Sequence, residues 1–523
     1  MDGCSIGRVE PEDKIEKRMN KVILEEHGRF WWHDEPIPEG FWAPENSQIG
    51  TLKIDVKGSS ILEMHGFFPG DSAPSIFDNL SRLRKEHRCI QGIIKDSNKY
   101  ILLLGVQGAG GSSRTHGISY PRYFSGRCLI SDDPFPQEKL MFQQMEINLK
   151  GFEQWLRLGS IKFEREPERV SATYEKPQDI SYPLEEGEFF VQYDLHQQYN
   201  LIQKHTLSMS ESAFIVYHPK EEKYLEDMEK QFLLFQDLLI LLTGSDFPLE
   251  WPTLLINKSK CQYYFSRMKG SSNPPEWQEC WTNFIQLQSN FGKIFSSWRE
   301  KREIFGPGFY LYIGTLRKVK LYPEHRFMNM IWGLEAFDRR KFKEEQPQKT
   351  QEKIQRILGE VKLKKDRNWL QERLKFAHEP ALEARIRKIL SVLPFNFKKG
   401  SLQKFSEKCA RYRHDITHFG GQRNTPNYSD FVIDLVKMSK ALSYLFHAVI
   451  LLELSVDKEL IKSNPLSWKM NHSLVEAGLL DEEILHIPNS ATSPPGRGRV
   501  DYEQTIKTGR SQYPVKHNEE VQK

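Results

Sequence analysis

The hydrophobic pattern of this chain changes near residue 225, and that change limits the folds it can adopt. Before residue 225, short apolar or alternating runs such as 51–56, 99–106 and 188–195 are separated by Gly, Pro, Asn and Ser, which is typical of β-strands. From residue 322 onward, apolar residues recur every three or four positions, as they do on one face of an α-helix. We therefore predict an α+β multidomain protein, with a mainly-β N-terminal domain followed by an all-α C-terminal bundle.

A chain of 523 residues is too long for one compact core, and this pattern divides it into five segments. They are a charged N-terminal extension (1–27), a mainly-β domain (28–224), a mixed connecting region (225–320), a helical domain (321–460) and a C-terminal extension (461–523). The polar composition of the tail predicts disorder from about residue 488. The expected helices of the second half are 323–340, 350–361, 367–376, 381–392, 401–418 and 427–456.

Cysteine usage and apolar runs indicate where such a chain works. The six cysteines are scattered without a CxxC pair, so neither a disulfide scaffold nor a zinc site is predicted. The N-terminus mixes charges of both signs and lacks the apolar core of a signal peptide. The most apolar stretch, 431–454, contains Asp434, Lys437 and Lys440, which favours a buried helix over a membrane span. We expect a cytoplasmic protein with no membrane contact, no metal and no cofactor.

The small net charge of +4 conceals an uneven distribution. Between residues 339 and 414 there are 22 Lys and Arg against 9 Asp and Glu, a net charge of +13, which leaves 4 − 13 = −9 for the rest. A basic region of this strength attracts phosphate groups and nucleic acid. The alternative is that these charges coat the solvent faces of helices and pair with each other.

The basic region ends on Arg413, His414 and His418, which offer the chemistry of metal-free RNA cleavage. A histidine can accept the proton of the ribose 2′-OH, and a guanidinium can bind the phosphate and stabilise its developing charge. The spacing Arg-x4-His alone identifies nothing, because it also occurs at Arg82/His87 and Arg373/His378. Only the third match has a polar residue after the arginine and precedes a Gly-Gly helix stop.

Arg413-His414-x3-His418 resembles the R-[N/H/D]-x3-H signature of HEPN domains, helical bundles that commonly act as ribonucleases. Residues 40–68, GFWAPENSQIGTLKIDVKGSSILEMHGFF, resemble the start of the β-rich domain of ApeA-type anti-phage defence proteins. The resemblance implies that Arg413 and His418 are catalytic and that His414 shapes the site. It also implies a metal-free reaction in which two HEPN domains pair. Histidine is less common than asparagine after the arginine, and Arg411 also falls within the spacing that the family tolerates.

The resulting hypothesis is an endoribonuclease that cleaves cellular RNA, such as tRNA, when its β domain senses a phage-derived trigger. Lys404, Lys408 and Arg411 are assigned to substrate binding, and a homodimer or higher homo-oligomer is expected because the reaction needs both a base and an acid. Two alternatives stay open at this point. Arg413 and His418 could cap helix ends or pair with Asp415 or Glu335, and the protein could be a non-catalytic HEPN module for dimerisation or RNA binding.

Overall fold

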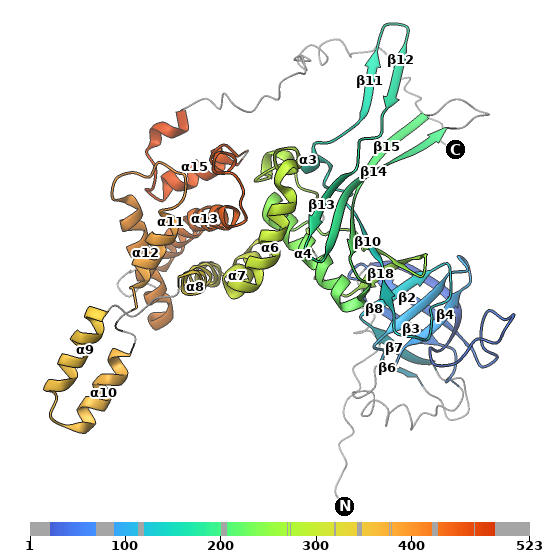
Figure 1. The fold of residues 1–523 in the computed structure, drawn as a ribbon, viewed down its shortest axis with the longest axis horizontal. Coiled ribbons are helices and arrows are strands. Elements are labelled where there is room, and N and C mark those ends of the chain that lie inside the picture. The colour runs from blue at the N-terminus through green and yellow to red at the C-terminus, as the bar shows by residue number, and fades with distance from the viewer. Residues whose placement is uncertain are drawn as a thin grey trace, which may run out of the picture.

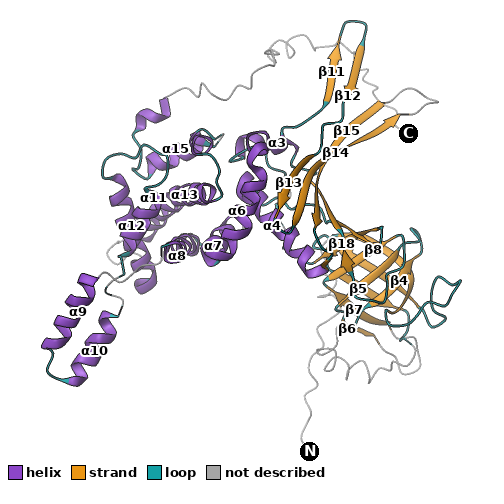
Figure 2. Cartoon of the chain, in the orientation of Figure 1, coloured by secondary structure: helices purple, strands orange, loops and turns teal. Residues whose placement is uncertain are grey.

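The computed structural model describes most of the chain and shows the predicted change from strands to helices. The described residues are 21–68, 88–112, 120–199, 207–268, 270–271, 273–317, 321–342, 348–375, 377, 379–420, 427–464 and 466–486. Strands occupy the first half of the chain (Figure 1) and helices dominate the second, as the colouring in Figure 2 makes plain. The predicted α+β fold is confirmed. The tail expected to be disordered from about residue 488 lies outside the described residues.

A 14-stranded sheet dominates the N-terminal half. In spatial order its strands are β13 (Ile180–Leu184), β14 (Gly187–Tyr199), β15 (Leu207–Pro219), β10 (Gln144–Asn148), β17 (Thr253–Ile256), β18 (Ser259–Phe265), β8 (Arg127–Ser131), β5 (Tyr100–Leu104), β4 (Ile90–Ile94), β1 (Val22–Trp32), β2 (Gln48–Asp55), β3 (Ser60–Met64), β7 (Tyr120–Ser125) and β6 (Gln107–Ser112). Two-stranded sheets join β11 (Ile161–Arg165) to β12 (Val170–Tyr174) and β9 (Met141–Phe142) to β16 (Lys223–Tyr224).

The sheet extends beyond both ends of the β domain expected from the sequence. β1 begins at Val22, inside the segment 1–27 that was expected to be an extension, and pairs there with the end of β2. β17 and β18 belong to the segment 225–320, yet they lie between β10 and β8 in the sheet. The charged residues Glu25 and Glu26 lie within β1, so the sequence did not predict a strand there. β17 and β18 pair with strands far earlier in the chain, and the local spacing of apolar residues does not indicate such pairing.

Two hydrophobic cores hold these elements together. One lies among the N-terminal strands β1 to β8. The other runs without a break from β10, β14 and β15 through α4 (Leu225–Thr243), α6 (Phe291–Phe305) and α7 (Pro307–Leu316) into the C-terminal helices. α4 is the main connector, because the Phe232 ring packs edge-on against Phe265 of β18 at 5.2 Å and its Leu234 carbonyl accepts a 3.0 Å hydrogen bond from Trp298 of α6. The two halves of the chain are therefore packed against each other.

The C-terminal half is a bundle of helices with one projecting hairpin (Figure 1). Its helices are α8 (Pro323–Lys341), α9 (Gln348–Glu360), α10 (Lys364–Leu374), α11 (Leu382–Leu390), α12 (Ser401–Phe419), α13 (Tyr428–Glu453), α14 (Lys458–Lys462) and α15 (Ser467–Glu476). The 3₁₀ turn Glu482–His486 follows α15, and the shorter helical segments outside the bundle are α3 (Glu153–Leu156), α5 (Phe284–Leu287) and the 3₁₀ turns Trp277–Glu279 and Gln288–Asn290. The six helices expected from the sequence are all present, with ends within three residues of the predicted ones.

α13 is the central helix of the bundle. It is long and apolar enough to cross a membrane by length and composition, but 67% of its most apolar window is buried within the protein, as is usual for a core helix. Phe446, Leu445 and Leu442 are fully buried, and α8 and α15 pack along its sides. The apolar pattern of this helix therefore serves the packing of the bundle.

One buried histidine of α13 links the bundle to the N-terminal half. His447 stacks on Trp281 with ring centroids 4.3 Å apart, its Nε2 lies 2.7 Å from the Leu241 carbonyl of α4, and its Nδ1 lies 2.9 Å from the Tyr312 hydroxyl of α7. A neutral imidazole donates its Nε2–H to the Leu241 carbonyl, and its Nδ1 then shares the single proton of the Tyr312 hydroxyl with the Ser443 carbonyl, which lies 3.1 Å from that hydroxyl. Burial lowers the pKa of His447 to about 3, although the hydrogen bond to Leu241 acts in the opposite direction.

This histidine predicts a loss of stability in acid. An unfolded histidine takes up a proton near pH 6.5, whereas folded His447 resists protonation until about pH 3, so its contribution is complete above pH 6.5 and is lost as the pH falls. The expected slope is about 1.4 kcal/mol of unfolding free energy per pH unit within that window. Denaturant unfolding of wild type and His447→Phe between pH 4 and 7 checks this by difference. Exposed His472 gives the control variant, His472→Phe, which should keep the wild-type slope.

Candidate functional site

The predicted motif lies on α12, whose ends and rotation are fixed by its sequence. The helix starts after Gly400 and stops at Gly420, both in the left-handed region with φ of 74° and 68°, and the Gly420 N–H donates to the Ile416 carbonyl at 3.2 Å. Phe405, Cys409 and Tyr412 recur at helical spacing and are buried against the bundle. This apolar face turns the opposite side of the helix toward solvent.

That opposite side carries a continuous exposed stripe of charged and polar residues. Spacings of three and four residues connect its members, which are Lys404, Glu407, Arg411, His414 and His418. Four of the six residues predicted for the site therefore share one exposed face. We call this row the α12 stripe.

His414 and His418 are neighbours within the α12 stripe. Their ring centroids lie 4.5 Å apart with the ring planes tilted by 45°. Because an imidazole can accept or donate a proton near neutral pH, such a pair offers two proton-transfer groups at one position on the surface. The sequence analysis had placed His414 in the catalytic set with Arg413 and His418, as the residue that shapes the site, and this role stays a prediction.

Arg413 lies on the flank of α12 instead of on the stripe. Five residues turn an α-helix by about 140°, so Arg413 and His418 leave the helix in different directions, whereas the seven residues between Arg411 and His418 return to within about 20°. Arg413 is half-buried, and its Nε is a buried donor without a hydrogen-bond partner within the described part of the chain. The helix thus brings Arg411, and not Arg413, onto the same face as His418.

Lys408 is engaged in a contact with α13. Its ammonium lies 2.8 and 2.7 Å from the two carboxylate oxygens of Asp434, which also accept a hydrogen bond from the Tyr412 hydroxyl. Burial raises the pKa of Asp434, but the hydrogen bonds from Lys408 and Tyr412 outweigh it and leave the pKa below its usual value. Burial, together with donation to Asp434, raises the pKa of Tyr412. The charge of Lys408 is therefore already balanced, and the substrate-binding role assigned to it remains a prediction.

Lys404 lies near the start of α12, far from the histidines. Fourteen residues separate it from His418, which corresponds to about 21 Å along the helix axis. It borders a basic pocket of about 280 Å³ that is also lined by Lys398, Lys399 and Lys408. A phosphate bound there would belong to a different nucleotide from one bound beside His418.

Comparison with protein families supports what the two resemblances suggested. The family model for ApeA N-terminal domain 1 matches residues 25–298, and the model for the Apea-like HEPN domain matches residues 328–460. The chain belongs to the ApeA family. The HEPN match begins within α8 and ends within α14, and it includes all of α12. HEPN domains are usually ribonucleases that commonly dimerise. No curated protein and no solved structure is significantly similar to this ApeA-family chain.

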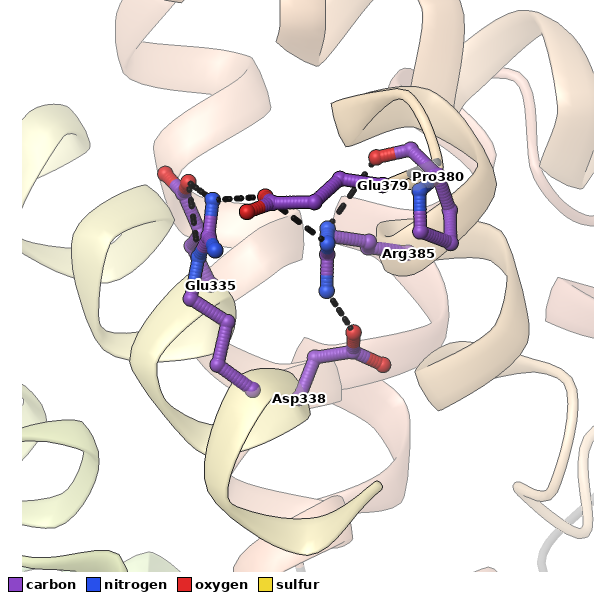
Figure 3. Close-up of polar contacts among 6 residues, drawn as sticks. Glu335, Asp338, Glu379, Pro380 and Arg385 are labelled. Atoms are coloured by element: carbon purple, nitrogen blue, oxygen red, sulfur yellow. Dashed lines mark hydrogen bonds and ion pairs between the residues drawn. The ribbon is translucent and has the colours of Figure 1, made fainter. Parts of the chain in front are cut away.

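Glu335, considered in the sequence as a partner for the motif, belongs to a different network of the HEPN domain. Its carboxylate lies 3.2 Å from Arg339, which also contacts Glu379 at 2.5 Å (Figure 3). Glu379 in turn contacts Arg385 at 3.2 Å. Arg385 and Asp338 form the buried end of the network. Pairing of Glu335 with Arg413 or His418 is thus replaced by pairing with Arg339.

The other two Arg-x4-His matches carry no site that can be described. His87 and His378 both lie outside the described residues, while Arg373 is on α10. Among the residues that the structure describes, no three His, Cys, Asp or Glu side chains come together as a metal site requires. The exposed row that holds His414, His418 and Arg411 makes the α12 stripe the candidate site of this ApeA-family protein.

Proposed function

We propose that this protein is a cytoplasmic endoribonuclease of anti-phage defence that cleaves cellular RNA, such as tRNA, without a metal ion. The observation that carries the proposal is the exposed pair His414 and His418, aligned with Arg411 at the end of α12 within a HEPN domain. These are the residue types that RNA cleavage by its own 2′-OH requires.

In the proposed reaction, an imidazole removes the proton of the ribose 2′-OH, and the 2′-oxygen attacks the adjacent phosphorus. A bond forms between that oxygen and phosphorus, and the bond from phosphorus to the 5′-oxygen of the next nucleotide breaks. A protonated imidazole gives its proton to the departing 5′-oxygen. Arginine stabilises the charge on the phosphorane. The products are a 2′,3′-cyclic phosphate and a 5′-hydroxyl.

The positions of Arg413 and His418 favour a homodimer as the active species. In one chain these residues leave α12 on different sides, so a single phosphate meets both most easily when a second HEPN domain faces the α12 stripe. The buried Nε of Arg413, which has no partner among the described residues, is consistent with a donor that completes its contacts in the assembled site. The second domain also provides further imidazoles for the acid and base roles.

The hairpin of α9 and α10 supplies a surface for the rest of the RNA. Residues 348–375 contain nine Lys or Arg and four Asp or Glu, and the hairpin projects away from the bundle (Figure 1). Lys365, Trp369 and Arg373 form one row at spacings of four residues, with the Trp369 side chain 61% exposed and the Arg373 guanidinium 5.7 Å from its ring. An exposed indole between two cations suits base stacking beside phosphates.

Reversing the charge of this row is expected to weaken RNA binding. The double variant Lys365→Glu/Arg373→Glu should raise the dissociation constant for RNA at least tenfold and lower the slope of log K against log salt by about 1 to 2, because two phosphate contacts are lost. Neither side chain forms an ion pair within the described residues, so stability should be unchanged. Fluorescence anisotropy with labelled tRNA at several salt concentrations measures both effects. Lys458→Glu/Lys462→Glu on α14 is the matched control, and equal weakening by that pair would contradict the assignment.

We assign the sensing role to the N-terminal β region. An apolar patch lies over β1, β2 and β4, with Phe41, Trp42 and Ile49 all at least half exposed beside a pocket of about 540 Å³. Such patches are frequent where proteins bind partners. The strands under the patch belong to the N-terminal core, and β4 pairs with β5, whose Leu102 belongs to the core that continues through α4 into the HEPN domain. A phage-derived trigger bound at the patch could thereby alter the catalytic domain.

A non-catalytic HEPN interaction module is the second candidate. The half-buried position of Arg413 favours it, since a helix flank is also where an arginine serves packing. A non-catalytic module would bind RNA or dimerise, yet leave the RNA intact.

The two candidates are separated by incubating the purified full-length protein with total RNA, in the presence of EDTA and after the addition of Mg²⁺. The nuclease proposal predicts discrete fragments in EDTA. If the protein binds RNA but leaves it intact, also in lysates of phage-infected cells, the result supports the interaction module. Cleavage that disappears in EDTA and returns with Mg²⁺ would overturn the metal-independent mechanism.

A further inference from the structure

A second pocket of the HEPN domain lies across α13 from the α12 stripe. It has a volume of about 490 Å³ and opens between α8, α13 and α15, where these helices meet the end of α4. α12 contacts α13 through Asp434, whereas the pocket is lined by Ser443, and nine residues correspond to two and a half helical turns. The pocket and the α12 stripe are thus on opposite sides of the same helix.

Two cations at this pocket have no ion-pair partner among the described residues. Arg326 of α8 and Lys440 of α13 both line it and are both exposed. Lys469 of α15 also lines it, but its charge is balanced by Glu279 at 3.2 Å. The lining therefore carries about two uncompensated positive charges, which suits one phosphate monoester dianion.

The interior of the pocket offers polar and aromatic contacts. Ser439 is only 4% exposed and lines the pocket, and its hydroxyl has no hydrogen-bond partner among the residues that the structure describes. A buried hydroxyl without a partner is uncommon and indicates a contact that an occupant would make. Trp281 and Tyr444 form an aromatic wall with ring centroids 6.0 Å apart. The volume lies in the usual range for small-molecule sites.

We infer that this pocket binds a free phosphorylated nucleoside. The phosphate lies between Arg326 and Lys440, the base packs against Trp281 and Tyr444, and a ribose or base polar group bonds to the Ser439 hydroxyl. Gly244 at the end of α4 also lines the pocket, so a ligand there contacts both the N-terminal half and the HEPN domain. The inference does not depend on RNA cleavage, because its test measures binding alone.

Isothermal titration calorimetry of the full-length protein with adenosine and guanosine 5′-monophosphates tests the inference. We expect saturable binding of at least one of the two, about tenfold weaker in Arg326→Gln and in Lys440→Gln, since each removes a charge-assisted contact. Ser439→Ala should weaken binding a few-fold. Lys437→Gln, an exposed lysine of the same helix that does not line the pocket, should bind as wild type does.

Three further results would overturn the inference. The first is the absence of saturable binding by either nucleotide, and the second is equal binding by wild type and both pocket-cation variants. The third is equally tight binding of inorganic phosphate, which would make the pocket an anion site without nucleoside recognition. Unphosphorylated adenosine and guanosine should bind at least tenfold more weakly than their monophosphates, because they leave both cations without a partner.

Discussion

Replacing His418 with alanine should reduce RNA cleavage by a factor of about 10² to 10⁴, which is the usual contribution of a side chain that transfers a proton in the rate-determining step. His418 is exposed in the last turn of α12, so its removal leaves the apolar face of the helix and the stability of the bundle unchanged. The measurement is the initial rate of fragment formation from total RNA by purified full-length protein. Thermal unfolding of the variant at the wild-type temperature excludes misfolding as the cause.

The same assay distinguishes the roles of the neighbouring residues. His472→Ala removes an exposed histidine from α15 and should retain full activity. Arg413→Ala should lose as much as His418→Ala if it stabilises the phosphorane, whereas Arg411→Ala should mainly raise KM if it only holds the substrate. A larger loss of kcat in Arg411→Ala than in Arg413→Ala would reassign the catalytic arginine to the α12 stripe. Wild-type activity in His418→Ala would remove the histidine from the mechanism altogether.

Replacing Arg385 with alanine should destabilise the HEPN domain by about 3 to 5 kcal/mol, because it leaves a buried carboxylate without its partner. Arg385 and Asp338 are 3% and 0% exposed, and their charged groups lie 2.6 Å apart (Figure 3). Arg385 also donates to the Pro380 carbonyl at 3.1 Å and contacts Glu379. This one side chain therefore connects α11 and the segment before it to α8. The expected fall in the midpoint of the corresponding thermal transition is roughly 6 to 20 °C.

A double variant provides the control for this prediction. Asp338→Leu/Arg385→Met replaces both charges by apolar groups of similar size, and it should recover most of the lost stability. Calorimetry on the full-length protein measures all three proteins, and the HEPN transition is assigned by its response to these variants. A loss below about 1 kcal/mol in Arg385→Ala would contradict the prediction and show that the buried carboxylate finds other partners.

The helices of this protein could be predicted closely because their signals are local. The 401–418 prediction became α12 at Ser401–Phe419, since its apolar residues recur at helical spacing and glycines stand at both ends. The order of the strands could not be predicted in this way. The sheet places β17 and β18 between strands from much earlier in the chain, and such pairing depends on tertiary packing.

The candidate site was predicted in residue type but not in arrangement. The motif indicated Arg413 and His418, and helical periodicity could have shown beforehand that Arg411 is the arginine sharing a face with His418. The partner of Lys408 could not be found in the sequence, because Asp434 lies 26 residues away on another helix. The buried pair of Arg385 and Asp338 was hidden for the same reason, because the two residues lie on different helices and the charge of residues 339–414 suggested only a basic surface around Arg385.

The chemistry of the RNA ends is the most direct test of the proposed nuclease. Fragments produced by the full-length protein should end in 2′,3′-cyclic phosphate and begin with 5′-hydroxyl, because the nucleophile is the RNA's own 2′-oxygen. Labelling with polynucleotide kinase before and after phosphatase treatment reads the 5′ ends. Release of the 3′ phosphate by phosphatase only after mild acid has opened the cyclic ester reads the 3′ ends, and the fragments should be absent with His418→Ala. Fragments that carry 3′-hydroxyl and 5′-phosphate ends would contradict the account, since they require attack by water in place of the 2′-OH.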